Sequence, residues 1–288
     1  INIKTIAPEI IVDNNLMKLE SIKTNISLKS LIENRFTIDN LQASTKAIKI
    51  SDLILFFRAI KYSPELFILD RIAKGGFLIA DIKLNFDKDG EIKSDYKING
   101  FIKNAKMDIF KENDITNLNL LFKIEKNKYL LEDINGKFGQ LVLSAPTISI
   151  EQKKDKFKIK GKIITDKKNI DNDILNDLFA KNFKNFYVED IRFGSENNFS
   201  LDVSKKFKVS NVKFQSLINL DNLKYKKNFS NIKKYLPNFK NFIKLENHKV
   251  SINYHNKKLD IIGKGQIKIN EESDNVDYKI IKKNNQYS

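Results

Sequence analysis

Two short stretches of this sequence contain residue types that could hold a metal ion. "DKDG" (Asp87–Gly90) has the composition of the first residues of a calcium-binding loop, but the twelfth position of such a loop would be Ile98 instead of glutamate. We therefore interpret it as a hairpin turn, in which Asp89 and Gly90 are a favoured pair. His248 and His255 flank an expected strand seven residues apart, so their side chains point to opposite faces, and no cysteine or acidic partner accompanies them. Neither stretch predicts a metal site.

No pattern of catalytic residues is present either. The chain has no cysteine, and it contains no nucleophile elbow, phosphate-binding loop or dinucleotide fingerprint. Its carboxylates are scattered through expected turns, and none can be paired as general acid and base. We therefore predict a protein that is not an enzyme and that uses no cofactor and no metal.

The elements that carry these residues are mostly strands. In residues 76–100, "GFLIADIKLNFDKDGEIKSDYKING", nearly every second residue is apolar, and residues 118–124, 157–163 and 259–269 alternate in the same way. Period-two alternation indicates half-buried strands, most often antiparallel. The sequence therefore predicts a mainly β protein: a long antiparallel, strongly curved sheet of repeated hairpins that forms a groove, with a few short helical insertions.

A weak repeat accompanies the alternation. Four segments read strand, polar turn, then a second strand with the pattern Ile-x-Gly-x-apolar, and their glycines are Gly100, Gly136, Gly161 and Gly263. Glycine inside a strand marks a bulge, a bend or the close approach of another group. Two interpretations stay open: the sheet curves around its own side chains, or the glycines leave space on the inner face for a ligand.

Helical signals interrupt the strands near residues 51–74, 170–186 and 227–243. The first region has Ser63 as an expected N-cap and Pro64 at the first helical position. The third is basic and amphipathic, and it could either touch a membrane or cover a sheet edge. We expect residues 1–165 to form one groove segment and residues 166–288 to continue it, with a frayed polar tail after Asn270.

Composition narrows the class of protein. The formal charge is +16, with 41% hydrophobic and 31% charged residues. The lysines are dispersed along the polar faces of strands, which argues against a nucleic-acid-binding module. No run of about 18 apolar residues is present, so no helix here is expected to span a bilayer. The chain begins with Ile1, which suggests a processed or excised piece. The heavy use of Lys, Asn and Ile is interpreted as coding bias.

Two segments resemble a known family. Residues 22–54 contain a strand, a serine-leucine corner, a basic turn and a second strand, carried by Leu28, Ser30, Leu31, Ile32, Arg35, Phe36, Ile38 and Leu41. Residues 75–107 contain the hairpin and its glycine. In this order the segments resemble the AsmA-like family of bacterial envelope proteins (AsmA/TamB/YhdP type), most closely over residues 22–163.

The resemblance implies a non-enzymatic protein of the Gram-negative cell envelope. Such a protein would lie in the periplasm, attached to the inner membrane by a helix outside this chain. Its U-shaped β-groove would bind phospholipids and carry them between the inner and outer membranes in support of outer-membrane assembly. Phospholipids are then the expected partners, outer-membrane proteins are further candidates, and nucleic acid is not expected. The family offers no catalytic motif to transfer.

The alternation nominates the residues that would line the groove: Leu28, Ile82, Leu84, Phe86, Tyr96, Ile98, Leu120, Phe122, Phe157 and Ile159. The alternative is a structural or adhesive β-protein, in which the same strands close around their own side chains and bind no ligand. A basic nucleic-acid-binding protein is a weaker alternative, because its lysines would be expected to cluster.

Overall fold

The computed structural model describes residues 1–26, 38–60, 64–110, 113–139, 141–170, 187–226, 235, 237–240, 242–283 and 286–287. Strands account for 78% of the structure and helices for 7%. Among the described residues the strands pair in antiparallel fashion, and two short helices are inserted between them. The prediction of a mainly β, antiparallel fold with helical insertions is therefore confirmed.

The chain divides into two compact units. Unit 1 contains residues 1–136 and 147–153, and unit 2 contains residues 137–146 and 154–288. The division falls within β9 (Lys128–Phe138) and β10 (Leu141–Gln152), which contribute residues to both units. The sequence suggested instead a seam around residues 166–186. Residues 166–170 end β11 (Lys156–Ile170) of unit 2, and residues 171–186 lie outside the described residues.

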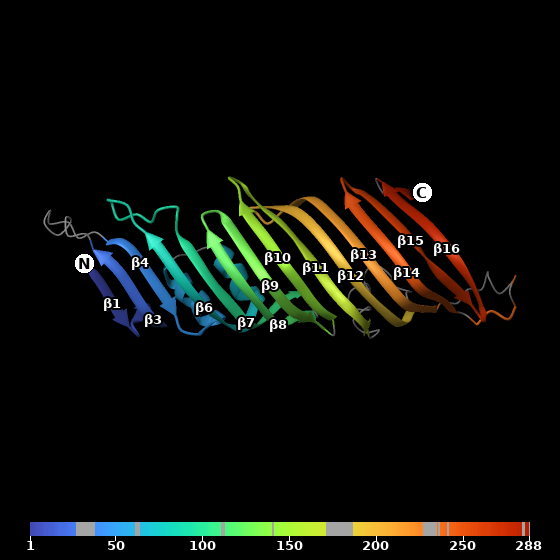
Figure 1. Ribbon diagram of the computed structural model, residues 1–288, viewed down its shortest axis with the longest axis horizontal. Coiled ribbons are helices and arrows are strands. Elements are labelled where there is room, and N and C mark those ends of the chain that lie inside the picture. The colour runs from blue at the N-terminus through green and yellow to red at the C-terminus, as the bar shows by residue number, and fades with distance from the viewer. Residues whose placement is uncertain are drawn as a thin grey trace. The chain divides into compact units, whose positions relative to one another are not determined.

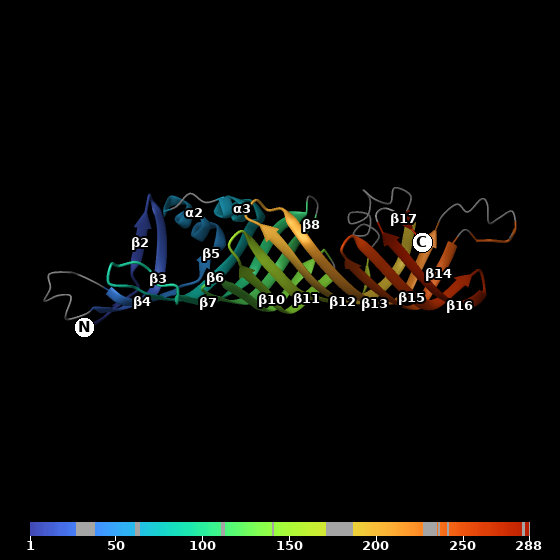
Figure 2. The same ribbon diagram turned by 90° about the horizontal axis from the view of Figure 1, so that it is seen from above.

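In unit 1, consecutive strands form the antiparallel ladder β3·β4·β6·β7·β8. The short strand β1 pairs with β3 (Figure 1). The strand β2 also pairs with β3, and β5 pairs with β6 (Figure 2). The bounds are β1 (Asn2–Ile6), β2 (Glu9–Val12), β3 (Asn15–Ile26), β4 (Ile38–Thr45), β5 (Ile48–Lys49), β6 (Ala73–Asn85), β7 (Lys97–Phe110) and β8 (Asn113–Glu125).

In unit 2, each strand from β11 onward pairs with the next along the chain. The bounds after β11 are β12 (Tyr187–Ser204), β13 (Val209–Lys226), β14 (Phe242–His255), β15 (Lys258–Ile269), β16 (Glu272–Lys283) and β17 (Gln286–Tyr287). The prediction of a frayed tail after Asn270 is wrong over β16, which pairs with β15 along its full length. Val276, Tyr278 and Ile280 alternate there with polar residues, and Val276 and Tyr278 are half-buried.

Bulges interrupt the ladders of both units at residues of one chemical kind. The register shifts by one residue at Asn104, Asn117, Asp190, Asn211 and Asn247, and each of these residues has a φ between 50° and 53°. Asn and Asp enter this left-handed region more readily than other non-glycine residues. A bulge bends its strand and increases the local twist. The asparagines at these sites therefore have a structural role that coding bias does not explain.

Two hairpin turns follow the expected turn chemistry. In "DKDG", the Asp87 carboxylate accepts hydrogen bonds from the backbone N–H groups of Asp89 and Glu91, both at 2.9 Å, and Gly90 has a φ of 81°. These backbone N–H groups, with Glu91 first, lower the pKa of Asp87. Between β14 and β15, Asn256 and Lys257 both have positive φ, as a two-residue type I′ loop requires.

The helices predicted near residues 51–74 are present as α2 (Ile50–Ile60) and α3 (Pro64–Ile72). They pack against β3, β6 and β7 on one side of the sheet of unit 1 (Figure 2). Arg58 of α2 forms an ion pair with Asp70 of α3. Neither helix is long and apolar enough to cross a membrane, and no other described helix is.

The other two predicted helical insertions fall mainly outside the described residues. Residues 171–186 lie outside them, as do residues 227–234, 236 and 241. In the insertion predicted at residues 227–243, the described residues Tyr235, Pro237 and Asn238 form turns, and Phe242 and Ile243 begin β14. The described part of this segment is therefore not helical.

Candidate functional site

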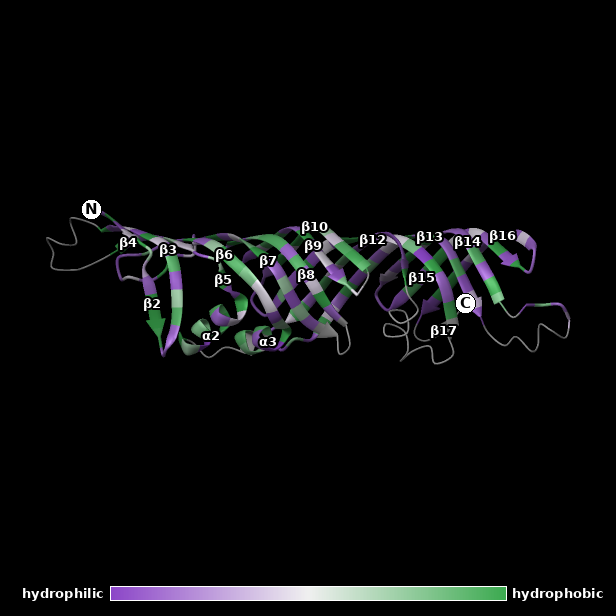
Figure 3. Ribbon diagram, turned by 90° about the horizontal axis from the view of Figure 1, so that it is seen from below, coloured by the Kyte–Doolittle hydropathy of each residue, from purple (hydrophilic) through white to green (hydrophobic). Residues whose placement is uncertain are grey.

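The apolar residues of unit 1 line up across three strands on one face. In the register, Ile82, Ile98 and Ile124 lie opposite one another on β6, β7 and β8, and Ile102 lies opposite Leu120. Figure 3 shows hydrophobic and hydrophilic residues alternating along these strands. We call this surface the apolar face of unit 1. Its centre is a packed cluster of Ala80, Leu120 and Phe122, surrounded by half-buried Leu78, Ile98, Ile102, Leu118, Ile124, Leu131 and Ile134.

The structure brings several of the predicted groove residues together on this face. Ile98, Leu120 and Phe122 belong to the central cluster and its surround, and the exposed fractions of Leu120 and Phe122 are only 9% and 7%. Ile82 lies directly opposite Ile98, and Leu84 lies opposite Leu41 of β4. These five predicted residues therefore share one continuous surface.

Two predicted residues of unit 1 lie at a strand end, away from this cluster. Phe86 forms an isolated bridge with Ile92 beside the "DKDG" turn. Tyr96 precedes β7, and its hydroxyl donates a hydrogen bond of 2.6 Å to the Lys126 carbonyl oxygen, at the edge of a polar hollow of about 550 Å³. Leu28 lies outside the described residues.

Two of the four glycines of the repeat, Gly100 and Gly263, do not leave empty space. A Cβ built on Gly100 would lie 2.7 Å from Cζ of Phe122, the residue opposite it, so the aromatic ring occupies the position of the missing side chain. In unit 2, the ring of Tyr278 covers Gly263 in the same way, with its Cζ 2.2 Å from the built Cβ. At these two positions the sheet fills the gap with its own aromatic side chains. This favours the interpretation in which the sheet curves around its own side chains over the one in which the glycines leave space for a ligand.

Unit 2 has a longer apolar face across six strands. The register places apolar side chains of β11 to β16 on the same side, because paired residues in neighbouring strands point the same way. The predicted residues Phe157 and Ile159 of β11 lie at one end, opposite Val203 and Leu201 of β12. The face continues through Phe199, Phe214, Ile218, Val250, Ile252, Tyr254, Leu259, Ile261, Tyr278 and Ile280.

This face is covered mainly by its own neighbouring side chains. Ile218, Ile252 and Ile261 are half-buried, with neither the full burial of a core nor the exposure of the opposite face. Within the described part of unit 2, the extensive contacts of each strand are with the strands beside it, so no second sheet or helix of described residues packs on the face. A half-buried apolar surface of this kind is typical of a binding surface.

Polar groups interrupt the apolar face of unit 2 near its middle. The Ser216 hydroxyl donates to Asn197 Oδ1 at 2.7 Å, and Asn197 Nδ2 contacts the Ser195 hydroxyl at 2.8 Å. His248 is 1% exposed, with its ring over Gly265 and Nε2 2.9 Å from the Gln266 carbonyl oxygen. Nε2 must therefore be the protonated nitrogen that donates to this carbonyl, and Nδ1 has no hydrogen-bond partner among the described residues.

The opposite side of unit 2, which we call its charged face, holds several lysines in ion pairs. Lys162 Nζ lies 2.6 Å from Glu196 Oε2, and Lys156 Nζ lies 2.6 Å from Asp202 Oδ2. Hydrogen bonds from Lys156, and then from Asn211, lower the pKa of Asp202. Some of the lysines expected from the sequence to be solvated are thus paired here with carboxylates on adjacent strands.

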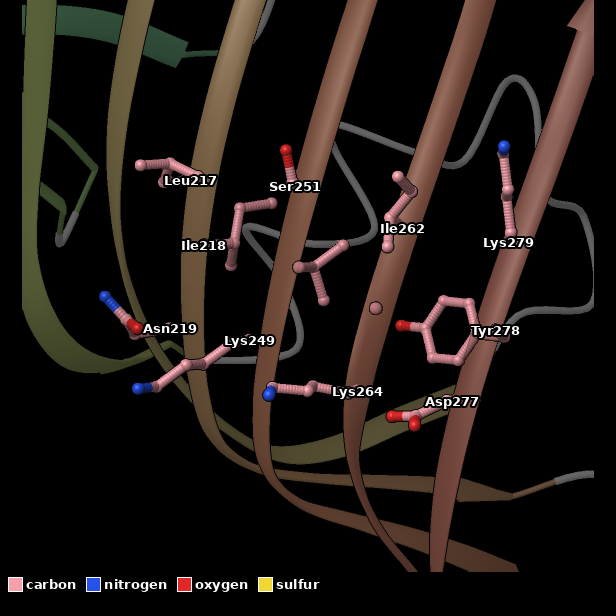
Figure 4. A pocket seen from close by; sticks show the side chains of 12 residues that line it. Leu217, Ile218, Asn219, Lys249, Ser251, Ile262, Lys264, Asp277, Tyr278 and Lys279 are labelled. Carbon is pink, nitrogen blue, oxygen red and sulfur yellow. The ribbon is translucent and has the colours of Figure 1, made fainter.

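A hollow of about 710 Å³ lies on the charged face, and several of its lysines form no ion pair with another described residue (Figure 4). Two adjacent cross-strand rows on the charged face border it: Asn219, Lys249, Lys264 and Asp277 in one row, and Leu217, Ser251, Ile262 and Lys279 in the next. Between them runs a row that points to the apolar face: Ile218, Val250, Gly263 and Tyr278. We call this feature the lysine hollow.

Sequence reasoning did not find the lysine hollow. Leu217 and Ile262 break the alternation as apolar residues at polar positions, and that was the available signal. The register that brings them beside Lys249, Lys264 and Lys279 is counted back from the two-residue loop at Asn256 and Lys257, and this register was not predicted from the sequence.

Comparison with family models, curated proteins and solved structures finds no match to this chain. Within the residues that the structure describes, no group of three or more histidine or acidic side chains could hold a metal ion. The candidate sites are therefore the apolar faces and the lysine hollow.

Proposed function

We propose that this protein binds the acyl chains of phospholipids along the apolar face of unit 2 and carries them without chemical change. The observation that carries the proposal is the half-buried apolar surface across β11 to β16, on which no second sheet or helix of described residues packs. The proposal needs no catalytic group, because passive partition of acyl chains would suffice.

The dimensions of the face suit such a ligand. β12 has 18 residues, and at about 3.3 Å per residue it extends over roughly 59 Å. Six strands spaced by about 4.8 Å give a width near 24 Å. One leaflet of a bilayer is about 15 Å of hydrocarbon, half of the roughly 30 Å core. Several acyl chains could therefore lie side by side on this surface while their charged head groups remain in water.

The expected free energy is sufficient for binding. Full burial of a methylene group is worth about 0.8 kcal/mol, so a chain of about 15 methylenes with half of its surface covered would gain about 6 kcal/mol. Association entropy opposes this gain. A two-chain phospholipid would therefore bind with moderate affinity, which permits release as well as capture.

The resemblance to the AsmA-like family extends the proposal to a cellular role. In that role the chain would move phospholipids between the inner and outer membranes, in the periplasm, anchored to the inner membrane by a helix outside this chain. Partner proteins of the outer membrane belong to the same proposal. The residues that support this extension are those of the resembling segments, of which 38–54 and 75–107 form β4 to β7 and α2 in unit 1.

A structural or adhesive role without a ligand is the alternative, and one observation favours it. The rings of Phe122 and Tyr278 fill the spaces above Gly100 and Gly263, so the sheet uses part of its apolar surface to pack on itself. In that case the half-buried side chains of unit 2 would be covered by parts of the protein outside the described residues or by another protein.

Native mass spectrometry of the gently purified full chain, with lipid extraction of the same sample, would test the proposal. We expect bound phospholipid that is lost in Ile252→Asn/Ile261→Asn, a pair directly opposed on the apolar face. Ile262→Asn is the matched control, because Ile262 is 50% exposed on the opposite face. A folded protein free of lipid, or equal loss in the control, would support the structural alternative instead.

A further inference from the structure

The lysine hollow concentrates positive charge that the protein does not neutralise. Lys249 and Lys264 lie directly opposite each other in the β14·β15 register. Like charges at directly opposed positions destabilise a sheet. Other lysines of unit 2 also oppose each other, such as Lys244 and Lys268. There, however, a carboxylate forms an ion pair with one member of the pair, as Glu246 does with Lys244. A sheet that retains an unfavourable pair of lysines presents a site for an external anion.

No carboxylate among the described residues forms an ion pair with either lysine of this pair. Lys249, Lys264 and Lys279 take part in no ion pair there. Asp277 lies opposite Lys264 in the register and forms no ion pair with it at 4 Å or less. Three ammonium groups against one carboxylate leave a local excess of positive charge, which attracts anions over about one Debye length.

Two large aliphatic side chains stand among these lysines. Leu217 is 58% exposed and Ile262 is 50% exposed, and both belong to the row that also holds Ser251 and Lys279 (Figure 4). Leaving such side chains in water is unfavourable by an amount proportional to their apolar area. The occupant that fits should therefore offer both negative charge and an apolar layer.

From these features we infer that the lysine hollow docks unit 2 onto the surface of a bilayer that contains anionic phospholipid. The three lysines contact the phosphate groups, and Leu217 and Ile262 insert into the boundary between head groups and acyl chains. A nucleic acid fits less well, because the exposed side chains are aliphatic and provide no aromatic platform on which bases could stack. An added peptide strand also fits less well, because the backbone groups of β13 to β16 are already paired.

This inference does not depend on acyl-chain binding by the apolar face. The two surfaces can be separated by neighbouring residues, since Ile261 points to the apolar face and Ile262 to the charged face. Ile262→Asn should weaken bilayer docking and leave extracted lipid unchanged, whereas Ile252→Asn/Ile261→Asn should do the reverse. Failure of one proposal is therefore distinguishable from failure of the other.

Vesicle flotation of the full chain tests the inference. Phosphatidylcholine vesicles with and without phosphatidylglycerol are the probes, and we expect flotation only with the anionic lipid. Each lysine near an anionic surface contributes about 5-fold to partition, so Lys249→Gln/Lys264→Gln should weaken binding about 25-fold. Lys158→Gln/Lys160→Gln is the matched control, because it removes the same amount of charge from the charged face at β11, outside the lysine hollow. It should change binding far less.

Several results would overturn the inference. Equal weakening in the two double variants would mean diffuse attraction by net charge without a site. Flotation that inorganic phosphate abolishes at constant ionic strength would mean a site for free phosphate instead of a bilayer. Binding of single-stranded DNA that is lost in Lys249→Gln/Lys264→Gln, with no flotation of the unaltered chain, would assign the hollow to nucleic acid. Circular dichroism of each variant confirms that the fold is retained.

Discussion

The substitution Gly100→Ala tests whether aromatic rings fill the glycine positions of the sheet. The added Cβ would lie 2.7 Å from Phe122 Cζ and 2.2 Å from the Ile79 carbonyl oxygen, so both the ring and the backbone must shift. Overpacking of this kind costs about 1–3 kcal/mol. Replacing a strand glycine by alanine gains about 0.5–1 kcal/mol from the unfolded chain. We expect a net loss of roughly 1–2 kcal/mol in the free energy of unfolding.

Gly136→Ala is the matched control, because it is the same substitution at another glycine of the repeat. Its built Cβ lies 3.4 Å from Leu118 Cδ1 and 3.5 Å from Ile115 Cγ2, which are ordinary contacts. Only the gain should remain, so this variant is expected to be stabilised by about 0.5 kcal/mol. The two variants should then differ by about 2 kcal/mol, or close to 1 M in the urea midpoint for a slope near 2 kcal/mol/M.

Urea unfolding followed by far-ultraviolet circular dichroism measures both variants, since the chain contains no tryptophan. A third variant, Gly100→Ala/Phe122→Leu, separates the two contacts. The leucine side chain removes the clash at Cζ and leaves the clash at the Ile79 carbonyl oxygen, so part of the loss should be recovered relative to Phe122→Leu alone. If Gly100→Ala is as stable as Gly136→Ala, the ring does not occupy the glycine position and the explanation of the repeat is refuted.

Three further measurements probe other parts of the structure. Asp202→Asn should lower the free energy of unfolding by about 1 kcal/mol at pH 7, because Asp202 is 10% exposed and accepts hydrogen bonds from Lys156 and Asn211. The pKa of Asp202 is lowered in the folded state, so its contribution is complete above the unfolded value near 3.9 and is lost as the pH falls through the folded value; urea midpoints that differ by the same amount at pH 7 and pH 2 would contradict this. Asn247→Val should destabilise unit 2 by about 1–2 kcal/mol and Asn247→Gly by much less, because the residue at the bulge has a φ of 52°. Thermal melting measures both variants, and equal melting temperatures would mean that this φ is not needed. Burial raises the pKa of the Tyr278 hydroxyl, so its ultraviolet titration, isolated by comparison with Tyr278→Phe, should lie above the ordinary value of about 10, and a midpoint at or below that value would place the ring in water.

Alternation predicted the fold class because it reflects local physics. Each strand must present one apolar face, and the residues Leu118, Leu120, Phe122 and Ile124 do so whatever the neighbouring strand is. Helix α3 was predicted for a similar reason, since Pro64 fits only the first turn of a helix. The apolar face of unit 1 followed from the same alternation, and so did the placement of Phe157 and Ile159 in unit 2.

What the sequence did not predict depends on pairing between strands. The strand β16 looks polar by itself, and it is held by its register with β15. The two rings over Gly100 and Gly263 come from neighbouring strands, so no local pattern contains both partners. Asparagine is a common turn residue, and nothing local distinguishes Asn256 in a turn from Asn247 in a bulge, although both have positive φ.

The two-residue loop at Asn256 and Lys257 sets the register of both candidate surfaces of unit 2. Alternation assigns odd and even positions of a strand to opposite faces. Counted back from this loop, Lys249 lies opposite Lys264, and Val250 lies opposite Gly263 on the other side. A one-residue slip of this register would move Lys249 out of the row with Lys264 and would also shift Val250 from its place on the apolar face. The arrangement of lysines on one surface and of apolar side chains on the other is therefore a single property of the register.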